Sequence, residues 1–569
     1  MTAISTDEYV RRCTERVAIE RGRVRDALHR GRELQTRLLE EILTESRDTA
    51  FGRQHGLTRV RNRSDYSKAV PIRNYDAMAP WISRVCDGES NVLTGDDPVL
   101  FFKTSGSTGA NKAIPVTSKF MTRCFFPFYY AALGALQEQY PGAISGTDRT
   151  LNLRQGSSSD VTLTNSGRLH LGASQVDFVR SFGELTAAEP GSRAPWSMSL
   201  PGGPRWDNDL AKTYAKLRIA AEHDLECVIG INPAAVAALP YQLALWLPAI
   251  IKDMFDGTIG GAIAFPANRA RALELDRMAG GRSNVLPRDI WRNIRTLYCW
   301  TGGIAALYID KLKHAFGDDV AVVPAPLAAS EGPIALCADP LRPSTSCLAV
   351  SNAVFEFINA DHDIRPDSET LEFSDLECDR EYHVVISHLG GLHRYALGDV
   401  IRVVDGTAGV PRVEYAGRHA ASNLLGERLR DSHFISAVRR ASRELGIDIA
   451  NVACKPTTGS HRPHAQGYAM LVGTDVDFPD EIVERLTARI DDELGRLSPG
   501  YAKARQSAAM EPLSLKTVTP RAFFHEWQTR VSKGVRAAQA KDRVLVSEQA
   551  WGLLDSSKFP VLSKFVSLQ

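Results

Sequence analysis

The spacing of hydrophobic residues predicts a long amphipathic helix near the start of the chain. Between residues 22 and 44, apolar side chains recur at helical intervals among many charged ones. These apolar residues are Val24, Leu28, Leu34, Leu38, Leu39, Ile42 and Leu43. A helix with one apolar stripe and a charged opposite face is expected to pack on the outside of a larger body.

Two apolar runs then flank a small polar loop. Residues 92–103 (VLTGDDPVLFFK) predict a strand that leads into the loop TSGSTGANK. The following IPVT predicts a further short strand, which precedes the aromatic run FFPFYY at residues 125–130. The loop is therefore expected between two strands.

The middle of the chain has the order strand, helix, strand. Residues 296–303 (TLYCWTGG) predict a buried strand that ends at two glycines, and a helical pattern follows over 304–317. Residues 321–332 (AVVPAPLAASEG) predict another strand that ends in a polar turn. This order is typical of a parallel α/β sheet, so both glycine-bearing turns are expected at the carboxyl ends of parallel strands.

The pattern changes at two points further along. Residues 350–416 form short alternating runs separated by turns, which predict a β-rich, barrel-like subregion. After Gly417 we expect a helix over 433–445, two strands, an amphipathic helix over 480–497, and a final strand and helix.

These patterns together predict an α/β protein with two domains. The large N-terminal domain (1–416) is expected to contain parallel sheets flanked by helices together with the β-rich subregion. The smaller domain (417–569) is expected to be a mobile α+β closing domain.

One uncharged segment is long enough to span a bilayer. Residues 227–251 contain Pro233, Pro240 and Pro248, so a single uninterrupted helix is not expected there. We interpret the segment as a buried strand followed by short core helices.

The overall composition narrows the function classes. With 68 Lys plus Arg against 67 Asp plus Glu, the chain lacks the broad positive charge that nucleic acids or anionic membranes attract. Its 569 residues, 44% hydrophobic and 24% charged, are typical of a multidomain globular protein. Nine scattered Cys without a CxxC pair, and dense mixed charge over residues 8–34, predict a reduced, cytoplasmic protein without an export signal.

The loop at residues 104–112 carries the densest candidate chemistry. Its hydroxyls, its glycine backbone and Lys112 can surround and neutralise phosphate oxygens. It is not a Walker loop, because Asn111 stands where that motif has glycine and Ala113 stands where it has Ser or Thr. From the residues alone, a flexible surface loop and a phosphate site stay equally open.

Three further signals are weak in isolation. Glu331 in AASEG can bind Mg²⁺, and Asp399 in YALGD can accept hydrogen bonds from ribose hydroxyls. Lys541 in AQAKDRV can bring charge to a phosphate when the C-terminal domain is closed. The alternative for each is an ordinary solvated turn residue or surface lysine. Histidines 383, 388 and 393 recur every five residues, which suits no metal site, so no metal is assigned to them.

Taken in order, these motifs resemble the adenylate-forming superfamily, and most closely its Gretchen Hagen (auxin-responsive) family of acyl acid–amido synthetases, in a bacterial-type form. The resemblance rests on TSGSTGANKAIPVT, TGGIAAL, LAASEG, GGLHRYALGDVIRV, Gly417–Arg418 and the late pattern Gln539, Lys541, Arg543. It spans most of the chain, and the order and spacing are more specific than any single motif.

The resemblance implies a role for each motif residue. ATP phosphates would be held by Thr104, Ser105, Gly106, Ser107, Thr108, Gly109 and Lys112. Gly302, Gly303 and Ser330 would lie at the nucleotide, Glu331 at Mg²⁺, Asp399 at the ribose and Arg418 at the ribose or a phosphate. Lys541 would act at the reacting carboxylate and the α-phosphate, so that Lys541, Lys112 and Glu331 form the catalytic set.

Three positions depart from the family pattern. Leu327 stands where relatives often stack an aromatic residue on adenine, and the hinge stretch after Arg418 lacks an early acidic residue. Asp542 replaces a small or apolar residue beside the lysine, and its carboxylate could hold Lys541 back. We expect the acyl pocket near Phe125, Phe128, Trp300 and Leu327, although an aromatic run is more often plain core.

The implied activity is an ATP-dependent ligation that releases AMP. A small carboxylic acid would attack the α-phosphorus of MgATP to form an acyl-adenylate, and an amine or amino acid would then displace AMP to give an amide. Two alternatives stay open: a thioester-forming ligase that uses coenzyme A or a carrier thiol, and a non-catalytic nucleotide-binding scaffold. The identity of the acid and of the amine, and monomer against dimer, stay open as well.

Overall fold

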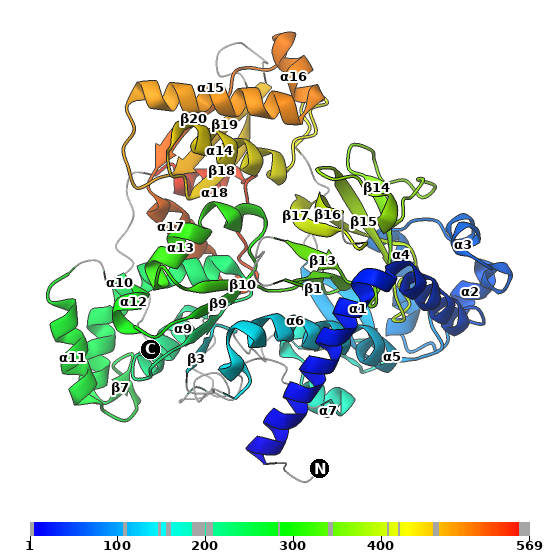
Figure 1. Ribbon diagram of the computed structural model, residues 1–569, viewed down its shortest axis with the longest axis horizontal. Coiled ribbons are helices and arrows are strands. Elements are labelled where there is room, and N and C mark those ends of the chain that lie inside the picture. Colours follow the sequence, from blue (N-terminus) through cyan, green and yellow to red (C-terminus); the bar gives the residue numbers. More distant parts are fainter. Residues whose placement is uncertain are drawn as a thin grey trace. The chain divides into compact units, whose positions relative to one another are not determined.

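A computed structural model describes residues 5–105, 111–145, 149–154, 161–184, 200, 209–282, 285–339, 345–406, 409–418, 422–458 and 466–556 (Figure 1). The chain divides into two compact units. Unit 1 comprises Met1–Ser145, Gly156–Pro190 and Val323–His419. Unit 2 comprises Gly146–Gln155, Gly191–Val322 and Ala420–Gln569. The domain boundary between residues 416 and 417 stays a prediction.

Unit 1 begins with the long helix α1 (Thr6–Ser46), which contains the predicted amphipathic segment. The Ser5 hydroxyl caps it by accepting a hydrogen bond from the Glu8 N–H at 3.2 Å. Its buried side includes Val24, Leu38 and Ile42, and α1 packs on α6 (Phe126–Gln139), so the predicted helix is confirmed. The other helices of this unit are α2 (Ala50–Gln54), α3 (Arg63–Ala69), α4 (Tyr75–Cys86), α5 (Ser118–Phe120) and α7 (Phe178–Phe182).

The described residues of unit 1 form two sheets. The first has the order β2-β1-β5-β4 and is formed by β1 (Pro98–Ser105), β2 (Asn111–Thr117), β4 (Thr162–Leu163) and β5 (Leu169–Leu171). The second has seven strands in the linear order β11-β12-β13-β17-β16-β15-β14, with every neighbouring pair antiparallel. Its strands are β11 (Leu327–Ala329), β12 (Gly332–Leu336), β13 (Ser346–Leu348), β14 (Val354–Asn359), β15 (Glu381–Ser387), β16 (Tyr395–Asp405) and β17 (Arg412–Arg418). The predicted β-rich subregion is confirmed, as part of an antiparallel sheet with two edge strands rather than a closed barrel.

Unit 2 contains the predicted parallel sheet, with strand order β10-β9-β6-β3. Both β3 (Thr150–Asn152) and β9 (Thr296–Cys299) pair with β6 (Cys227–Ile229) in parallel, and β10 (Ala321–Pro324) follows β9 at the edge. Its helices are α9 (Asp209–Ala220), α10 (Pro233–Asp256), α11 (Arg269–Ala279), α12 (Pro287–Ile290) and α13 (Ile309–Phe316), beside the hairpin β7 (Thr258–Ile259) and β8 (Ile263–Ala264).

Helix α10 corrects the prediction of short core helices after β6, because it runs without a break through Pro240 and Pro248. An internal proline costs a helix about 3 kcal/mol. Here the apolar face, with Leu243, Trp246 and Ile250 at most 3% exposed, offsets that cost by packing into the core. By length and composition α10 could cross a membrane, but half of its most apolar window is buried in the protein, as in a core helix.

The C-terminal part of unit 2 has the predicted α+β pattern. Strands β18 (Asn451–Thr458), β19 (Gln466–Gly473) and β20 (Ser514–Val518) form a sheet, which α14 (Asp431–Leu445) and α15 (Asp480–Leu497) cover (Figure 1). The remaining helices are α16 (Pro499–Gln506), α17 (Pro520–Ser532) and α18 (Glu548–Leu554). Trp527 and Val531 of α17 belong to the same apolar core as α9 and α10. This packing brings the late lysine motif to the parallel sheet of unit 2.

Candidate functional site

The predicted phosphate loop joins two paired strands. In unit 1, β1 and β2 are antiparallel, with Thr104 opposite Lys112 and Ser105 opposite Asn111. The predicted residues Gly106, Ser107, Thr108 and Gly109 lie outside the described residues. The Lys112 ammonium lies 5.2 Å from the centre of the Tyr75 ring, a cation–π contact. The strand pairing therefore fixes the two ends of the loop and the position of its lysine.

Glu331 lies in a two-residue turn between β11 and β12, where Ala329 pairs with Gly332. The predicted place of this turn, at the end of a parallel strand, is wrong. After β10 the chain continues through Ala325 and Pro326 into the antiparallel sheet, so Ser330 and Glu331 form a hairpin turn.

Glu331 is a buried acidic group whose ionised form is disfavoured at this position. Its side chain is 8% exposed, and the Tyr395 hydroxyl approaches its carboxylate at 3.5 Å. Burial raises the pKa of Glu331, the negative charge of Asp399 adds to the rise, and Lys112 and Arg418 oppose it. A divalent cation would stabilise the ionised carboxylate, so Glu331 fits Mg²⁺. Among the described residues no three His, Cys, Asp or Glu side chains form a ready metal site, so the remaining ligands would be nucleotide oxygens and water.

Asp399 and Arg418 are cross-strand partners on β16 and β17. Their side chains lie 3.6 Å apart, from Nε to Oδ1, and the Tyr415 hydroxyl lies 3.5 Å from the same oxygen. Asp399 is 6% exposed, whereas the Arg418 side chain is 57% exposed. The pair thus combines a fixed carboxylate with a guanidinium that a ligand can reach.

Sequence reasoning missed the part that His388 plays beneath Glu331. The His388 ring is fully buried, and burial lowers its pKa to about 4. Its Nδ1 accepts a hydrogen bond from the Gly390 N–H at 2.9 Å, so the proton is on Nε2, which donates to the Glu331 carbonyl at 2.7 Å. A neutral imidazole therefore holds the Glu331 turn. The signal in the sequence was a histidine separated by one leucine from two glycines, considered there only as a metal ligand.

Sequence reasoning also missed a buried ion pair that precedes the ribose motif. Arg394 donates to both carboxylate oxygens of Glu356, and each residue is 2% exposed. The Arg394 guanidinium also donates to the Ser67 and Val70 carbonyls. Arg394 has a φ of 44°, which is rare for a residue with a side chain. This network fixes the start of β16. The sequence feature that could have indicated it is the charged Glu356 inside the apolar run VFEFI.

In unit 2, Lys541 lies at the end of strand β9. Its ammonium is 4.3 Å from the centre of the Trp300 ring, one residue after the strand ends. Gly302 and Gly303 follow, and Gly303 has a φ of 64°, a left-handed conformation that glycine adopts freely. The structure thus brings together the predicted residues Lys541, Trp300, Gly302 and Gly303.

The carboxylate of Asp542 has a partner other than the neighbouring lysine. Its Oδ2 accepts a hydrogen bond from the Tyr308 hydroxyl at 3.0 Å. Burial raises the pKa of Asp542 to about 6, and Tyr308 and Arg530 oppose that rise. Asp542 thus contacts Tyr308 and Lys541 contacts Trp300, and the effect of Asp542 on the lysine stays a prediction.

The residues predicted for the acyl pocket are divided between the units. In unit 1, Phe128 is 3% exposed inside the core, whereas Phe125 and Leu327 are half-buried at its edge. Trp300 lies in unit 2 and is half-buried. The burial of Phe128 favours a packing role, and a pocket role for the other three stays a prediction.

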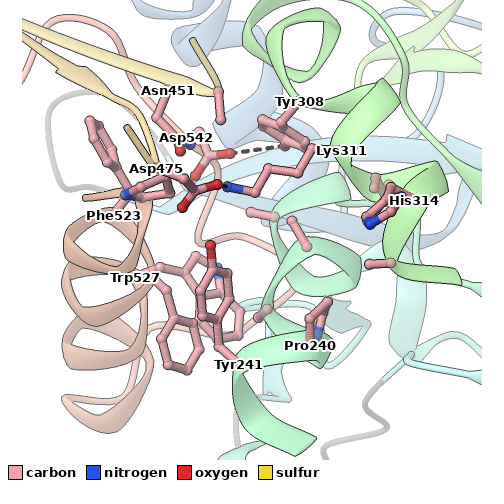
Figure 2. A pocket seen from close by; sticks show the side chains of 18 of the residues that line it. Pro240, Tyr241, Tyr308, Lys311, His314, Asn451, Asp475, Phe523, Trp527 and Asp542 are labelled. Atoms are coloured by element: carbon pink, nitrogen blue, oxygen red, sulfur yellow. Dashed lines mark hydrogen bonds and ion pairs between the residues drawn. The ribbon is translucent and has the colours of Figure 1, made fainter. Parts of the chain in front are cut away.

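Unit 2 also contains a cavity of about 360 Å³ that the sequence did not suggest (Figure 2). Its walls come from α10, α13 and α17, and they are largely apolar and aromatic. Polar side chains at its edge are Tyr308, Lys311, Asn451, Asp475 and Asp542. Lys311 and Asp475 form an ion pair.

Comparison with protein families gives three matches in chain order. Residues 20–321 match the GH3 family N-terminal domain, residues 346–418 the GH3 family central domain and residues 432–550 the GH3 family C-terminal domain. The first match alone covers more than half of the chain.

Similar proteins of known name agree with these matches. The chain is 24% identical over 595 aligned positions to a probable indole-3-acetic acid-amido synthetase GH3.12 of Oryza sativa subsp. japonica, with 94% of each chain covered. It is 23% identical to the indole-3-acetic acid-amido synthetase GH3.3 of Arabidopsis thaliana (89% and 88% covered) and 22% identical to the jasmonoyl–L-amino acid synthetase JAR6 of Nicotiana attenuata (94% of each). Among solved structures, the GH3.15 acyl acid amido synthetase has the same fold, with a TM-score of 0.75, 17% identity and coverage of 94% and 95%.

Proposed function

The chain belongs to the GH3 family, and from that premise we propose that it is an ATP-dependent ligase that joins a small carboxylic acid to an amine or amino acid. The acid is first converted to an acyl-adenylate with release of pyrophosphate, and the amine then displaces AMP. The observation that carries the proposal is the match of all three family domains in order. Its named relatives are amido synthetases that act on indole-3-acetic acid or jasmonate.

In this proposal the first half-reaction depends on positioning and charge rather than on a covalent intermediate with the protein. Thr104, Ser105 and Lys112 hold the phosphates together with the loop between them. Asp399 accepts hydrogen bonds from the ribose hydroxyls, and Arg418 contacts the ribose or a phosphate. Each of these residues lies at or near the end of a strand ladder in unit 1, and Asp399 and Arg418 are the last pair between β16 and β17.

Glu331 would hold Mg²⁺, which supplies positive charge to the phosphate oxygens when it is bound. Supporting this role, burial and Asp399 disfavour a bare carboxylate at this position. Ser330 shares the same hairpin turn. The neutral His388 keeps the turn in place through the Glu331 carbonyl.

Lys541 would neutralise charge between the substrate carboxylate and the α-phosphate. Its ammonium rests on Trp300, beside the Gly302–Gly303 turn proposed to border the adenine. An aromatic face stabilises a cation without forming a covalent or ionic bond, so the lysine can transfer to a phosphate when ATP arrives.

Two measurements on the purified protein test the proposal. Acid-dependent exchange of labelled pyrophosphate into ATP, over a panel of aromatic and aliphatic acids, is expected for at least one acid. With that acid, mass spectrometry of products formed with amino acids and with coenzyme A is expected to find an amide. A thioester as the only product would contradict amide synthesis, and nucleotide binding without exchange by any acid would favour the scaffold alternative. Magnesium dependence and a cytoplasmic location are further parts of the proposal.

A further inference from the structure

Four hydrogen bonds with surrounding side chains hold the segment that carries Lys541 in unit 2, and just after it Val544 and Val546 form backbone hydrogen bonds with Cys454. The Ala537 N–H donates to the Asp209 carboxylate at 3.0 Å, and the Asn232 amide donates to the Ala537 carbonyl at 2.9 Å. Beyond these two anchors, Arg530 donates to the Lys541 carbonyl at 3.1 Å, and the Tyr308 hydroxyl donates to Asp542 at 3.0 Å. Three of the four partners fix the backbone, whereas the Tyr308 bond fixes a side chain next to the lysine.

The hydrogen bond between Tyr308 and Asp542 connects the lysine segment to the stretch of chain that follows β9, which Lys541 also contacts. Trp300 and Tyr308 lie on the same stretch of chain, on either side of the Gly302–Gly303 turn. Lys541 contacts the first of them and Asp542 contacts the second. Two attachment points on one stretch fix the direction of the lysine side chain as well as its distance, which a single contact does not.

The surroundings of Asp542 make this bond important for its position. Asp542 and Tyr308 both line the cavity of unit 2, so space rather than packed side chains lies on one side of the pair (Figure 2). Tyr308 itself is 4% exposed and cannot turn to water. The groups that act on the Asp542 carboxylate are Tyr308, Arg530 and Glu526. A hydrogen bond to an ionised carboxylate is stronger than one between neutral groups.

We propose that Tyr308 and Asp542 are positioning residues that hold Lys541 in place for formation of the acyl-adenylate. The inference rests on the proposed function. It is specific to this chain, because the family resemblance leads us to expect a small or apolar residue beside the lysine. We assign the role to the first half-reaction, in which the proposed function places Lys541 between the substrate carboxylate and the α-phosphate.

The test separates the two half-reactions in the full-length enzyme. Tyr308→Phe keeps the ring and removes the hydroxyl, Asp542→Ala removes the acceptor, and Asp542→Asn keeps an acceptor oxygen. For the first two we expect a kcat of pyrophosphate exchange about tenfold lower with an unchanged KM for ATP, because a small displacement of a charged group slows the reaction strongly. Asp542→Asn should stay within about threefold of wild type. The rate at which an amine consumes a chemically prepared acyl-adenylate should be unchanged in all three.

Lys311→Met is the matched control. Lys311 lies one helical turn after Tyr308 and borders the same cavity. It also forms an ion pair with the side chain of Asp475, which lies in the C-terminal part of unit 2. The Asp475 side chain is 64% exposed, and exposed pairs contribute little, so less than a twofold change is expected.

A second measurement does not depend on activity. Trypsin cuts after Lys541 and Arg543, and mass spectrometry can follow those two cuts under native conditions. If the Tyr308 bond holds the segment, Tyr308→Phe should be cut there about tenfold faster than wild type while its melting temperature stays close to wild type, because local opening becomes more frequent.

Several results would overturn the inference. Wild-type exchange in Tyr308→Phe and Asp542→Ala would do so, as would equal slowing of both half-reactions or Asp542→Asn as slow as Asp542→Ala. Absence of exchange in the wild-type enzyme would instead refute the proposed function. In that case unchanged cutting in Tyr308→Phe would refute the anchoring independently.

Discussion

The candidate residues of the two units are held in place by different means. In unit 1, Thr104 and Lys112 face each other across one strand pair, Asp399 and Arg418 across another, and Glu331 lies in a two-residue hairpin turn. In unit 2, Lys541 lies on a segment outside the regular strands and helices. Hydrogen bonds with separate side chains hold this segment, and backbone pairing with Cys454 begins only at Val544. The hydrogen bonds of a strand ladder open together and therefore rarely, whereas a single side-chain bond can open by itself. Under the proposed function, the groups expected at the nucleotide are held by strand pairing, and the lysine is held by side-chain hydrogen bonds.

The largest expected effect is loss of the lysine charge. Lys541→Ala should lower acid-dependent pyrophosphate exchange about 1,000-fold, because a preorganised charge at the reacting phosphate is among the largest contributions to catalysis. Circular dichroism and the melting temperature should stay those of wild type. Lys533→Ala, at the end of α17, is the matched control and should keep wild-type exchange. Exchange at the wild-type rate in Lys541→Ala would remove the lysine from the catalytic set.

In unit 1, the start of strand β16, which carries Asp399, depends on the buried ion pair of Arg394 and Glu356. Glu356→Gln leaves the guanidinium without its charge partner, so the free energy of unfolding in urea should fall by about 3 kcal/mol. Glu444→Gln removes an acceptor from the exposed pair with Arg489 and should cost less than about 1 kcal/mol. Equal losses in the two variants would show that β16 does not depend on the buried pair.

The carboxylate of Glu331 should link catalysis to magnesium. Glu331→Gln is expected to lower the rate of pyrophosphate exchange about 100-fold at about 1 mM Mg²⁺, since a metal at the phosphates stabilises the transition state by several kcal/mol. High Mg²⁺ should restore part of the activity, and chelation should abolish exchange in both proteins. Glu377→Gln changes an exposed carboxylate of the same unit and should behave as wild type. A variant with the wild-type magnesium dependence would exclude Glu331 as a metal ligand.

Elements with a strong sequence pattern were predicted well. The amphipathic helices within α1 and α15, the parallel strand β9 and the β-rich region after residue 350 follow directly from hydrophobic spacing. Periodicity reports which face of an element is buried, and burial is the main determinant of these elements. The family resemblance then supplied the motif residues, which periodicity alone does not give.

The failures have a common physical cause, which is that tertiary contacts decide the outcome. Helix α10 continues through two prolines because its apolar face is buried on a core that no local pattern reveals. The Glu331 turn belongs to an antiparallel sheet because strand β12, which follows the turn, pairs with β13, a strand further along the chain. Arg394 and Glu356 are 38 residues apart, and Tyr308 and Asp542 are 234 apart, so single motifs could not indicate either pair.

The smallest expected effect concerns the neutral His388 beneath the Glu331 turn. Its pKa is lowered by burial from about 6.5 to about 4, so the unfolded chain binds a proton that the folded one does not in this pH range. The contribution of His388 to the free energy of unfolding is complete above pH 6.5 and falls as the pH approaches 4. At pH 5 the loss is about 2 kcal/mol. In His388→Gln, an amide that does not titrate can replace both hydrogen bonds. Between pH 7 and pH 5 the unfolding free energy of the variant should therefore fall by about 2 kcal/mol less than that of wild type. His362→Gln, which changes an exposed histidine, should keep the wild-type difference. An unaltered pH dependence in His388→Gln would mean that the imidazole beneath the turn gains its proton in the folded protein, and that the turn tolerates a charge there.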